Sequence, residues 1–235
     1  MILNDFFDGI YCVNLDHRND KWEDCKKDFD AIGCNLERFS AINGFEAGIP
    51  PQMPNPNFEI AGLRGFSPMR PGQVGCLLSH LGIIRLAISQ GMKNVMIVED
   101  DVAFDVEKFP EQCDFLNEIP VNWDMIYFGG NHQIDPTPCV NLDTMVESKT
   151  VSGTTCTFTT HCLAINLQSP MLNDMVFMIQ QVALPVDVCY AAFHAANHVF
   201  TSTQKITWQK ETFSDIEQRV VNYDSVLKES NEQKI

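Results

Sequence analysis

The chain has 235 residues, of which 45% are hydrophobic and 20% charged, a composition typical of a folded globular protein. Its 16 Lys and Arg residues face 31 Asp and Glu residues, which gives a net charge of -15. So anionic a surface repels phosphate backbones and anionic lipid headgroups, which disfavours nucleic-acid binding and polybasic docking to a membrane. An anionic small ligand would need a local cation in order to bind.

One domain is expected over residues 1–235, with a polar tail at about residues 217–235. Residues 1–11 carry Asp5 and Asp8 and no basic residue, which is the wrong charge for the start of a secretory signal. The most apolar stretch, residues 74–88, is interrupted by His80 and Arg85, so no transmembrane segment is expected. We therefore expect a soluble, cytoplasmic protein that could lie at the surface of a membrane carrying its substrate.

Nine cysteines are scattered along the chain, and no pair of them forms a Cys-x-x-Cys motif. A free cysteine behaves as a small hydrophobic residue, so the spacing favours reduced and mostly buried thiols. The pattern predicts neither a zinc centre nor a disulfide framework.

The N-terminal part has the pattern of a βαβ unit. Residues 10–15 are predicted to form a short buried strand, and residues 36–42 a second strand. Between them Trp22, Cys25, Phe29 and Ile32 recur at helical spacing, and Gly33 is placed to end that helix. A strand, a helix and a strand in about thirty residues indicate a parallel pair of strands.

The next segment changes character. Residues 45–70 contain five prolines and are predicted to form a long binding loop or lid. An apolar stripe over residues 77–88 then predicts a helix that Gly91 can cap. Residues 95–98 are continuously apolar, as in a strand buried on both faces.

Further strands are predicted at residues 125–128 and 199–206, with an alternating Thr-rich segment at 154–166. Helices are predicted at residues 167–180 and 188–196. The expected fold is a three-layer α/β/α sandwich with a mostly parallel, twisted sheet.

The strand at residues 95–98 ends in three consecutive acids, Glu99, Asp100 and Asp101. Their mutual repulsion can be offset by water or by a cation, and ligands of open α/β sheets bind at the carboxyl ends of the strands. Hard oxygen ligands suit Mn²⁺ or Mg²⁺. The alternative, a solvated acidic turn, stays open on spacing alone. Transfer of a sugar from a nucleoside diphosphate fits such a site, because a divalent ion neutralises the leaving diphosphate.

At this point the sequence resembles glycosyltransferase family 25, which includes bacterial lipooligosaccharide galactosyltransferases and the galactosyltransferase domains of collagen-modifying enzymes. The resemblance is carried, in order, by residues 13–18 (VNLDHR), 38–44 (RFSAING), 72–80 (GQVGCLLSH), 98–102 (VEDDV), 185–187 (PVD), Gln209 and residues 214–216 (SDI). It implies a GT-A fold, a UDP-hexose donor, a divalent metal, inversion at the anomeric carbon, and a saccharide or protein hydroxyl as acceptor. The chain departs from the family pattern at His17, Lys21, Asn43 and Gln73.

The resemblance also suggests roles for particular residues. Asp101 is the expected metal ligand, and Asp215 is a second candidate ligand and a weaker candidate for the catalytic base. Asp187 is the expected base, although it could instead be the N-cap of the helix that follows it. The residues expected to contact the donor are Asn14, Asp16, Arg18, Asn43, Ser79, His80, Glu99 and Asp100.

Plainer interpretations remain for several of these residues. Arg18 could form only a surface ion pair, and His80 could be a satisfied structural histidine. His194 and His198 would share a face if their segment is helical, but a structural role is the more common one. Two alternatives to a catalytic glycosyltransferase also remain: a sugar- or nucleotide-binding domain with reduced catalysis, and a nucleotidyltransferase, although the latter requires a basic Gly-rich loop that is not seen near the N-terminus.

Overall fold

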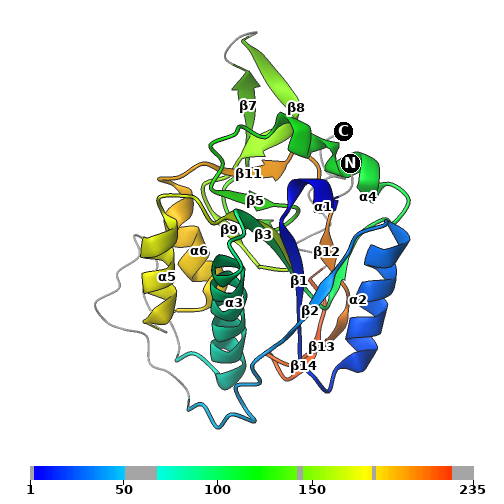
Figure 1. Ribbon diagram of the computed structural model, residues 1–235, viewed down its shortest axis with the longest axis vertical. Helices are drawn as coiled ribbons and strands as arrows, with labels where there is room; N and C mark the ends of the chain where they lie inside the picture. The colour runs from blue at the N-terminus through cyan, green and yellow to red at the C-terminus, as the bar shows by residue number, and fades with distance from the viewer. Residues whose placement is uncertain (1–2, 51–67, 142–144, 182–183, 224–235) are drawn as a thin grey trace.

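The computed structural model describes residues 3–50, 68–141, 145–181 and 184–223. Its centre is an eight-stranded sheet (Figure 1). The strands are, in spatial order, β2 (Glu37–Ser40), β1 (Gly9–Asn14), β3 (Asn94–Glu99), β10 (Cys162–Asn166), β5 (Met125–Tyr127), β11 (Val199–Ser202), β8 (Val146–Gly153) and β7 (Thr137–Asn141). β10 and β8 run against the direction shared by the other strands. The predicted mostly parallel sheet is thus confirmed, with two antiparallel insertions.

Helices cover both faces of the sheet, which confirms the three-layer sandwich. α3 (Pro71–Ser89), α5 (Leu172–Gln180) and α6 (Val186–His194) pack on one face (Figure 1). α1 (Leu3–Phe6), α2 (Asn19–Ala31), α4 (Phe109–Gln112) and the 3₁₀ helix η1 (Cys113–Glu118) lie on the other. The predicted strand–helix–strand unit at the N-terminus corresponds to β1, α2 and β2, with β1 and β2 parallel.

β3 shows why a continuous apolar run marks a central strand. Val95 and Ile97 enter the hydrophobic cluster under α3, whereas Met96 and Val98 enter the cluster under α2. Successive side chains of a strand point to opposite faces, so a strand with a helical layer on each side must be apolar at every position. The strand ends at Glu99, where the acidic triplet emerges.

Short strand pairs complete the fold beside the main sheet. β12 (Trp208–Gln209) pairs with β4 (Val102–Ala103), β13 (Thr212–Ser214) pairs with β14 (Arg219–Val221), and β6 (Asn131–His132) pairs with β9 (Thr157–Phe158). β14 occupies part of the segment predicted to be a polar tail. Because β4 directly follows Asp101, the β12–β4 pair brings the C-terminal segment beside the acidic triplet, with Gln209 opposite Val102.

Several predicted boundaries were wrong. The strand predicted at 199–206 ends at Ser202, and the helix predicted at 167–180 begins only at Leu172. His194 is the last residue of α6 and His198 lies beyond it, so the two histidines do not share a helical face. Of the predicted loop at 45–70, residues 51–67 lie outside the described residues.

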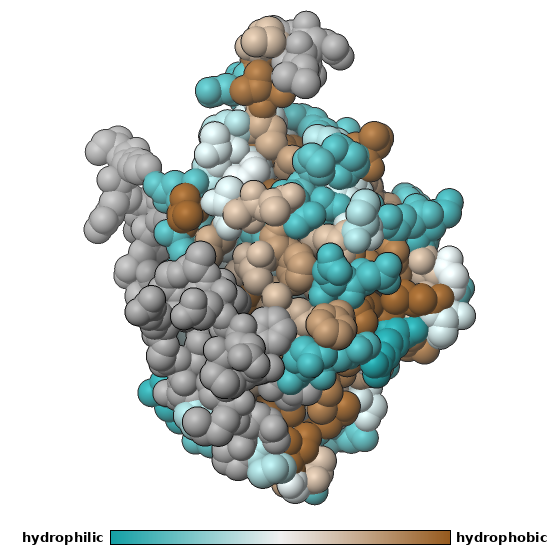
Figure 2. Space-filling model, turned by 90° about the vertical axis from the view of Figure 1, so that its left-hand side faces the viewer, coloured by the Kyte–Doolittle hydropathy of each residue, from teal (hydrophilic) through white to brown (hydrophobic). Residues whose placement is uncertain are grey.

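α3 is the one helix among the described residues that is long and apolar enough to be compared with a membrane span. Its length and a mean hydropathy of 1.3 would allow it to cross a membrane, but 56% of that window is buried inside the molecule. Leu77, Ile83 and Ile84 are fully buried in the core. On the side of the molecule that carries α5, hydrophilic and hydrophobic side chains are interspersed, and the β7–β8 hairpin projects above the body (Figure 2).

Candidate active site

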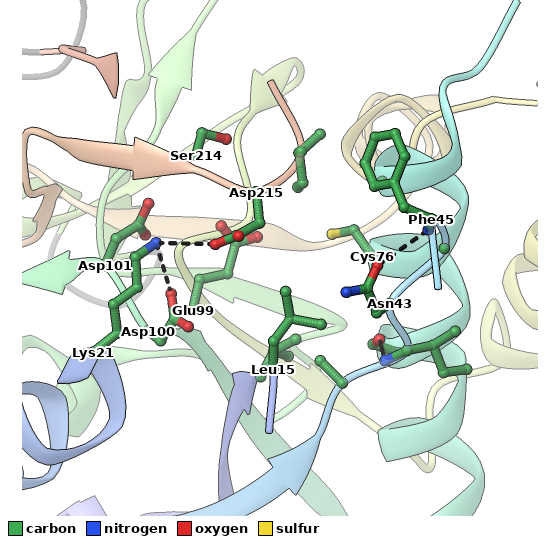
Figure 3. Close-up of a pocket in the computed structure, with 17 residues that line it drawn as sticks. Leu15, Lys21, Asn43, Phe45, Cys76, Glu99, Asp100, Asp101, Ser214 and Asp215 are labelled. Carbon is green, nitrogen blue, oxygen red and sulfur yellow. Dashed lines mark hydrogen bonds and ion pairs between the residues drawn. The ribbon is translucent and has the colours of Figure 1, made fainter. Parts of the chain in front are cut away.

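A cavity opens where the carboxyl ends of β1 and β3 meet the first turns of α3 (Figure 3). Asp100 and Asp101 line it together with Lys21 from α2 and Asp215 from the turn between β13 and β14. The remaining lining residues are Val13, Leu15, Ala41, Ile42, Asn43, Gly44, Phe45, Gly72, Cys76, Ser79, Glu99, Ser214 and Ile216. Five of the seven segments that carry the resemblance therefore contribute to this cavity, and residues 185–187 and Gln209 do not line it.

Parallel pairing explains how distant residues meet here. β1 and β3 are neighbours with Val13 opposite Glu99, so both strands end at the same edge of the sheet. Asn14 Nδ2 donates to Asp100 Oδ2 at 2.7 Å, and Arg38 Nε donates to Asn14 Oδ1 at 2.8 Å. Asn14 thus links the first strand to the triplet.

Cationic side chains from the start of α2 face these acids. The Lys21 ammonium lies 3.4 Å from Asp100 Oδ1 and 4.0 Å from Asp215 Oδ2 (Figure 3). Arg18 donates to Asp215 and also pairs with Asp20. The cationic side chains that an anionic ligand would need on so acidic a protein therefore come from the segment just after β1.

The triplet is an electrostatically costly arrangement. Burial, followed by the charges of Glu99 and Asp100, raises the pKa of Asp101 to about 7. Burial also raises the pKa of Asp100, although Lys21 opposes that shift. Burial works to raise the pKa of Glu99 as well, but His80 and Thr160 outweigh it, so that pKa is lowered. A carboxyl group with a pKa shifted this far is a functional-site candidate with a physical cause.

Asp101 is held by the C-terminal segment. Gln209 Nε2 lies 3.3 Å from Asp101 Oδ2, and the Lys210 amide donates to the Asp101 carbonyl at 2.8 Å. Gln209 Oε1 is buried and has no hydrogen-bond partner among the described residues. An unpartnered buried oxygen on the side chain that contacts Asp101 fits a site that accepts a cation.

A second cavity lies on the other side of Glu99 and Asp101, which line both. Asp187 lines this second cavity together with Thr159 and Tyr223. The Val188 amide donates to Asp187 Oδ1 at 2.9 Å, and the Thr159 amide donates to Asp187 Oδ2 at 3.4 Å. Burial raises the pKa of Asp187 despite these amides.

The N-cap interpretation of Asp187 is wrong, because the structure places Pro185 at the N-cap of α6 and Asp187 within the first turn. Its carboxylate faces a cavity from that position. The role as a base stays a prediction.

The walls of the first cavity are set by close backbone contacts. A Cβ added to Gly75 would lie 2.3 Å from the Ile42 carbonyl oxygen, and one added to Gly44 would lie 1.8 Å from the Pro71 carbonyl oxygen. Only glycine permits so close an approach. The Ser79 hydroxyl fastens the same contact, since it accepts from the Ile42 amide at 2.8 Å and donates to the Gly75 carbonyl at 2.7 Å.

Two departures from the family pattern keep their local hydrogen bonds. Gln73 Oε1 accepts from the Arg70 amide at 2.9 Å, the capping-box contact that Glu and Gln both make. Asn43 Oδ1 accepts from the Phe45 and Glu46 amides at 3.1 and 3.2 Å, a turn that Asn and Asp both support. Asn43 also lines the cavity, as expected.

Other predicted residues lie at the margin of the site. Asp16 is exposed and lines a shallow hollow with His17 and Asn43. His80 is fully buried, with Nδ1 3.2 Å from the Tyr190 hydroxyl and Nε2 3.7 Å from Glu99 Oε1. His194 bonds to Tyr127 and Thr157 in the core. His198 is exposed and lies beside Asn122 and Asp124, so neither joins the site.

Three residues of the site were not assigned a role from the sequence. Lys21 was noted only as a departure and Gln209 only as a family signature. The Thr160 hydroxyl donates to Glu99. The only sequence signal for Lys21 is its helical spacing from Arg18, three residues earlier on the same face. Nothing local marks Gln209 or Thr160, because their partners lie 108 and 61 residues away.

The comparisons with known proteins agree with the residue pattern. A glycosyltransferase family 25 protein of Drosophila melanogaster is 29% identical over 151 residues, 60% of this chain and 24% of that protein. Human procollagen galactosyltransferase 2 is 27% identical over 130 residues, 52% of this chain and 21% of its own length. The chain thus spans about a quarter of the length of the curated relatives it matches.

Among solved structures, mouse xyloside xylosyltransferase 1 matches 79% of this chain and 66% of its own with a TM-score of 0.38 and 9% identity. The family model described as glycosyltransferase family 25 (LPS biosynthesis protein) matches residues 7–190. With that match over most of its length, the chain belongs to glycosyltransferase family 25.

Proposed function

We propose that this member of the family is a metal-dependent, inverting hexosyltransferase that uses a UDP-sugar, with galactose or glucose as the sugar. The observation that carries the proposal is the position of Glu99 and Asp101 between two cavities. The first cavity offers Lys21 close to a donor phosphate, and the second offers Asp187 to an acceptor hydroxyl. The human relative is named a procollagen galactosyltransferase, which supports galactose. The acceptor is a saccharide or protein hydroxyl.

The residues present fit a divalent ion of the Mn²⁺ or Mg²⁺ class. Asp100 and Asp101 supply hard oxygens, and the oxygen of Gln209 that lacks a partner belongs to the side chain that contacts Asp101. Asp215 lines the same cavity and remains the second candidate ligand. When bound, such an ion supplies Lewis-acid stabilisation of the charge that develops on the leaving diphosphate.

The side chains of the chain itself supply the remaining chemistry. Asp187 takes the proton of the acceptor hydroxyl while that oxygen attacks the anomeric carbon and the bond to the diphosphate oxygen breaks. Its raised pKa makes it a stronger base. Lys21 and Arg18 offset the negative charge of the leaving group. Attack from the side opposite the diphosphate gives inversion.

The test is release of UDP from a panel of UDP-hexoses, with Mn²⁺ or with a chelator, in the presence and absence of a mixed saccharide acceptor. We expect release that needs the metal, and we expect Asp101→Asn to abolish it. The control is Asp174→Asn, which removes an exposed acid on α5. Equal release in chelator would remove the metal from the proposal. Binding of UDP-sugars without release would identify a binding domain with reduced catalysis.

A further inference from the structure

A second group of side chains that can bind a metal lies next to Asp100 and Asp101. Cys76 and His80 are one turn apart on α3, so both project from the same face of the helix. That face meets the end of β3, where Glu99 lies. One ligand atom from each of Cys76, His80 and Glu99 can be chosen such that all three lie within 4.8 Å of one another. Figure 3 shows Cys76 projecting from α3 into the cavity on the side of Glu99.

His80 supplies an independent observation. Its ring is fully buried, yet Nε2 has no hydrogen-bond partner among the described residues. The nearest carboxylate oxygen, Glu99 Oε1, is 3.7 Å away, beyond the distance of a hydrogen bond. At this distance the two groups attract each other as charges, but a buried ring nitrogen that lacks a hydrogen bond still costs free energy, and this one faces a thiol and a carboxylate.

We propose that Cys76, His80 and Glu99 form a site for a divalent transition metal that accepts a thiolate ligand, with Zn²⁺ as the expected occupant. Sulfur, imidazole nitrogen and carboxylate oxygen are the ligands of zinc sites, and three protein ligands leave a fourth position open. Both Cys76 and Glu99 line the two cavities, so the open position faces them. Mn²⁺ and Mg²⁺ prefer the oxygen ligands of Asp100 and Asp101. The two sites therefore select different ions.

Metal binding requires the three side chains to draw together, because their ligand atoms lie within 4.8 Å of one another. Ligand atoms of a tetrahedral zinc site lie roughly 3.5 Å apart, given metal–ligand distances of 2.0–2.3 Å. The separation of 3.7 Å between His80 Nε2 and Glu99 Oε1 is already close to this value. With the metal on Nε2, the Nδ1–H of His80 donates to the Tyr190 oxygen, 3.2 Å away. Such a donated bond is the usual partner of a metal-bound histidine. On binding, the proton of the Cys76 thiol leaves to solvent.

The experiment titrates the chelator-stripped protein with Co²⁺ under anaerobic conditions and records its absorption spectrum. A thiolate ligand produces a near-ultraviolet charge-transfer band, and oxygen ligands alone do not. We expect one band-forming Co²⁺ per chain and bleaching of the band by Zn²⁺. Cys76→Ser should lose the band, and His80→Gln should weaken Co²⁺ binding by roughly tenfold or more.

Two control variants establish that the band comes from Cys76 and does not depend on Asp100 and Asp101. Cys156→Ser removes another half-buried thiol, which is not among the three proposed ligands, and should keep the band. Asp101→Asn should keep it too, so failure of the proposed glycosyl transfer would leave this result unaffected. Absence of the band in the wild type, or its persistence in Cys76→Ser, would overturn the proposal. Far-ultraviolet circular dichroism establishes that each variant is folded.

Discussion

The ammonium of Lys21 lies 3.4 Å from Oδ1 of Asp100 and 4.0 Å from Oδ2 of Asp215. One cation from α2 therefore serves two carboxylates, one at the end of β3 and one in the C-terminal hairpin. Its side chain is only 10% exposed, so the pairing is largely shielded from solvent. In the proposed function, Lys21 and a bound divalent ion would share the task of neutralising these acids.

Lys21→Met is expected to lower the free energy of unfolding in chelator by about 3 kcal/mol, because it leaves buried carboxylates without their partner. Mn²⁺ should raise the melting temperature of this variant more than that of the wild type. Thermal unfolding with and without Mn²⁺ measures both effects. Lys26→Met is the control, since its pair with Asp30 is exposed and worth little. An equal Mn²⁺ shift in Lys21→Met and wild type would contradict the shared role.

The pKa of Asp101, raised to about 7 from its ordinary 3.8, makes stability depend on pH. A carboxyl group with a raised pKa stabilises the folded state fully at pH values below its ordinary pKa. That contribution is lost as pH rises through about 7. In chelator, we therefore expect the wild type to gain stability as pH falls from about 8.5 to 6.5, and Asp101→Asn to lack this gain.

The buried histidines act in the opposite direction. Burial lowers the pKa of His132, His161 and His194 to about 4 from the ordinary 6.5. Their contribution is present above pH 6.5 and is lost as pH falls toward 4. Urea unfolding of both proteins across this range should show a maximum for the wild type and only the acid-side decline for Asp101→Asn. Parallel curves would show that Asp101 does not titrate there.

Asp187→Asn is expected to lower the transfer rate by about 10²–10⁴-fold, the usual contribution of a general base. Donor binding should be unchanged, because Asp187 lies in the second cavity and does not line the first. Asparagine keeps an acceptor oxygen for the closer of the two amides, that of Val188 at 2.9 Å, so the fold should persist. Single-turnover kinetics and donor titration separate the two effects, and transfer at the normal rate would place the base elsewhere.

Gly75→Ala is expected to cost about 2 kcal/mol or more of stability, because the new methyl group would lie 2.3 Å from the Ile42 carbonyl oxygen. The backbone of both segments would have to separate, which would also deform the cavity. Gly153→Ala is the matched control, since its nearest atoms would be 3.9 and 4.0 Å away. Denaturant unfolding measures both, and similar losses would refute the steric argument.

Asn43→Asp and Gln73→Glu restore the residues usual in the family. Because both pairs make the same backbone contacts, we expect changes in stability within about 0.5 kcal/mol and no gain in UDP release. A large gain in activity would show that the departures had weakened the site, in favour of the domain with reduced catalysis.

Local pattern predicted the elements whose burial is dictated by neighbouring residues. The 3.6-residue spacing of Trp22, Cys25 and Phe29 predicted α2, and the unbroken run at residues 95–98 predicted β3. The antiparallel direction of β10 between β3 and β5 had no such signal, because alternation gives the faces of a strand but not its direction or neighbours. The two-residue strands β4 and β12 are likewise fixed only by tertiary pairing.

The same distinction holds for the site. Asn14 and Asp100 were predictable because Asn14 ends one recognisable strand and Asp100 follows another, and parallel strands bring their ends together. Gln209 could not be placed against Asp101, since that contact depends on the course of the C-terminal segment. The shared face expected for His194 and His198 failed because α6 ends at His194.

The parts of the wall of the first cavity differ in how much side-chain substitution they tolerate. Where Gly75 meets Ile42 and Gly44 meets Pro71, main chain touches main chain, so no larger side chain can be accommodated there. Ser214 and Ile216 line the same cavity with side chains. Evolutionary diversification of the ligand accepted by such a scaffold should therefore accumulate at Ser214 and Ile216, while Gly44 and Gly75 tolerate almost no variation.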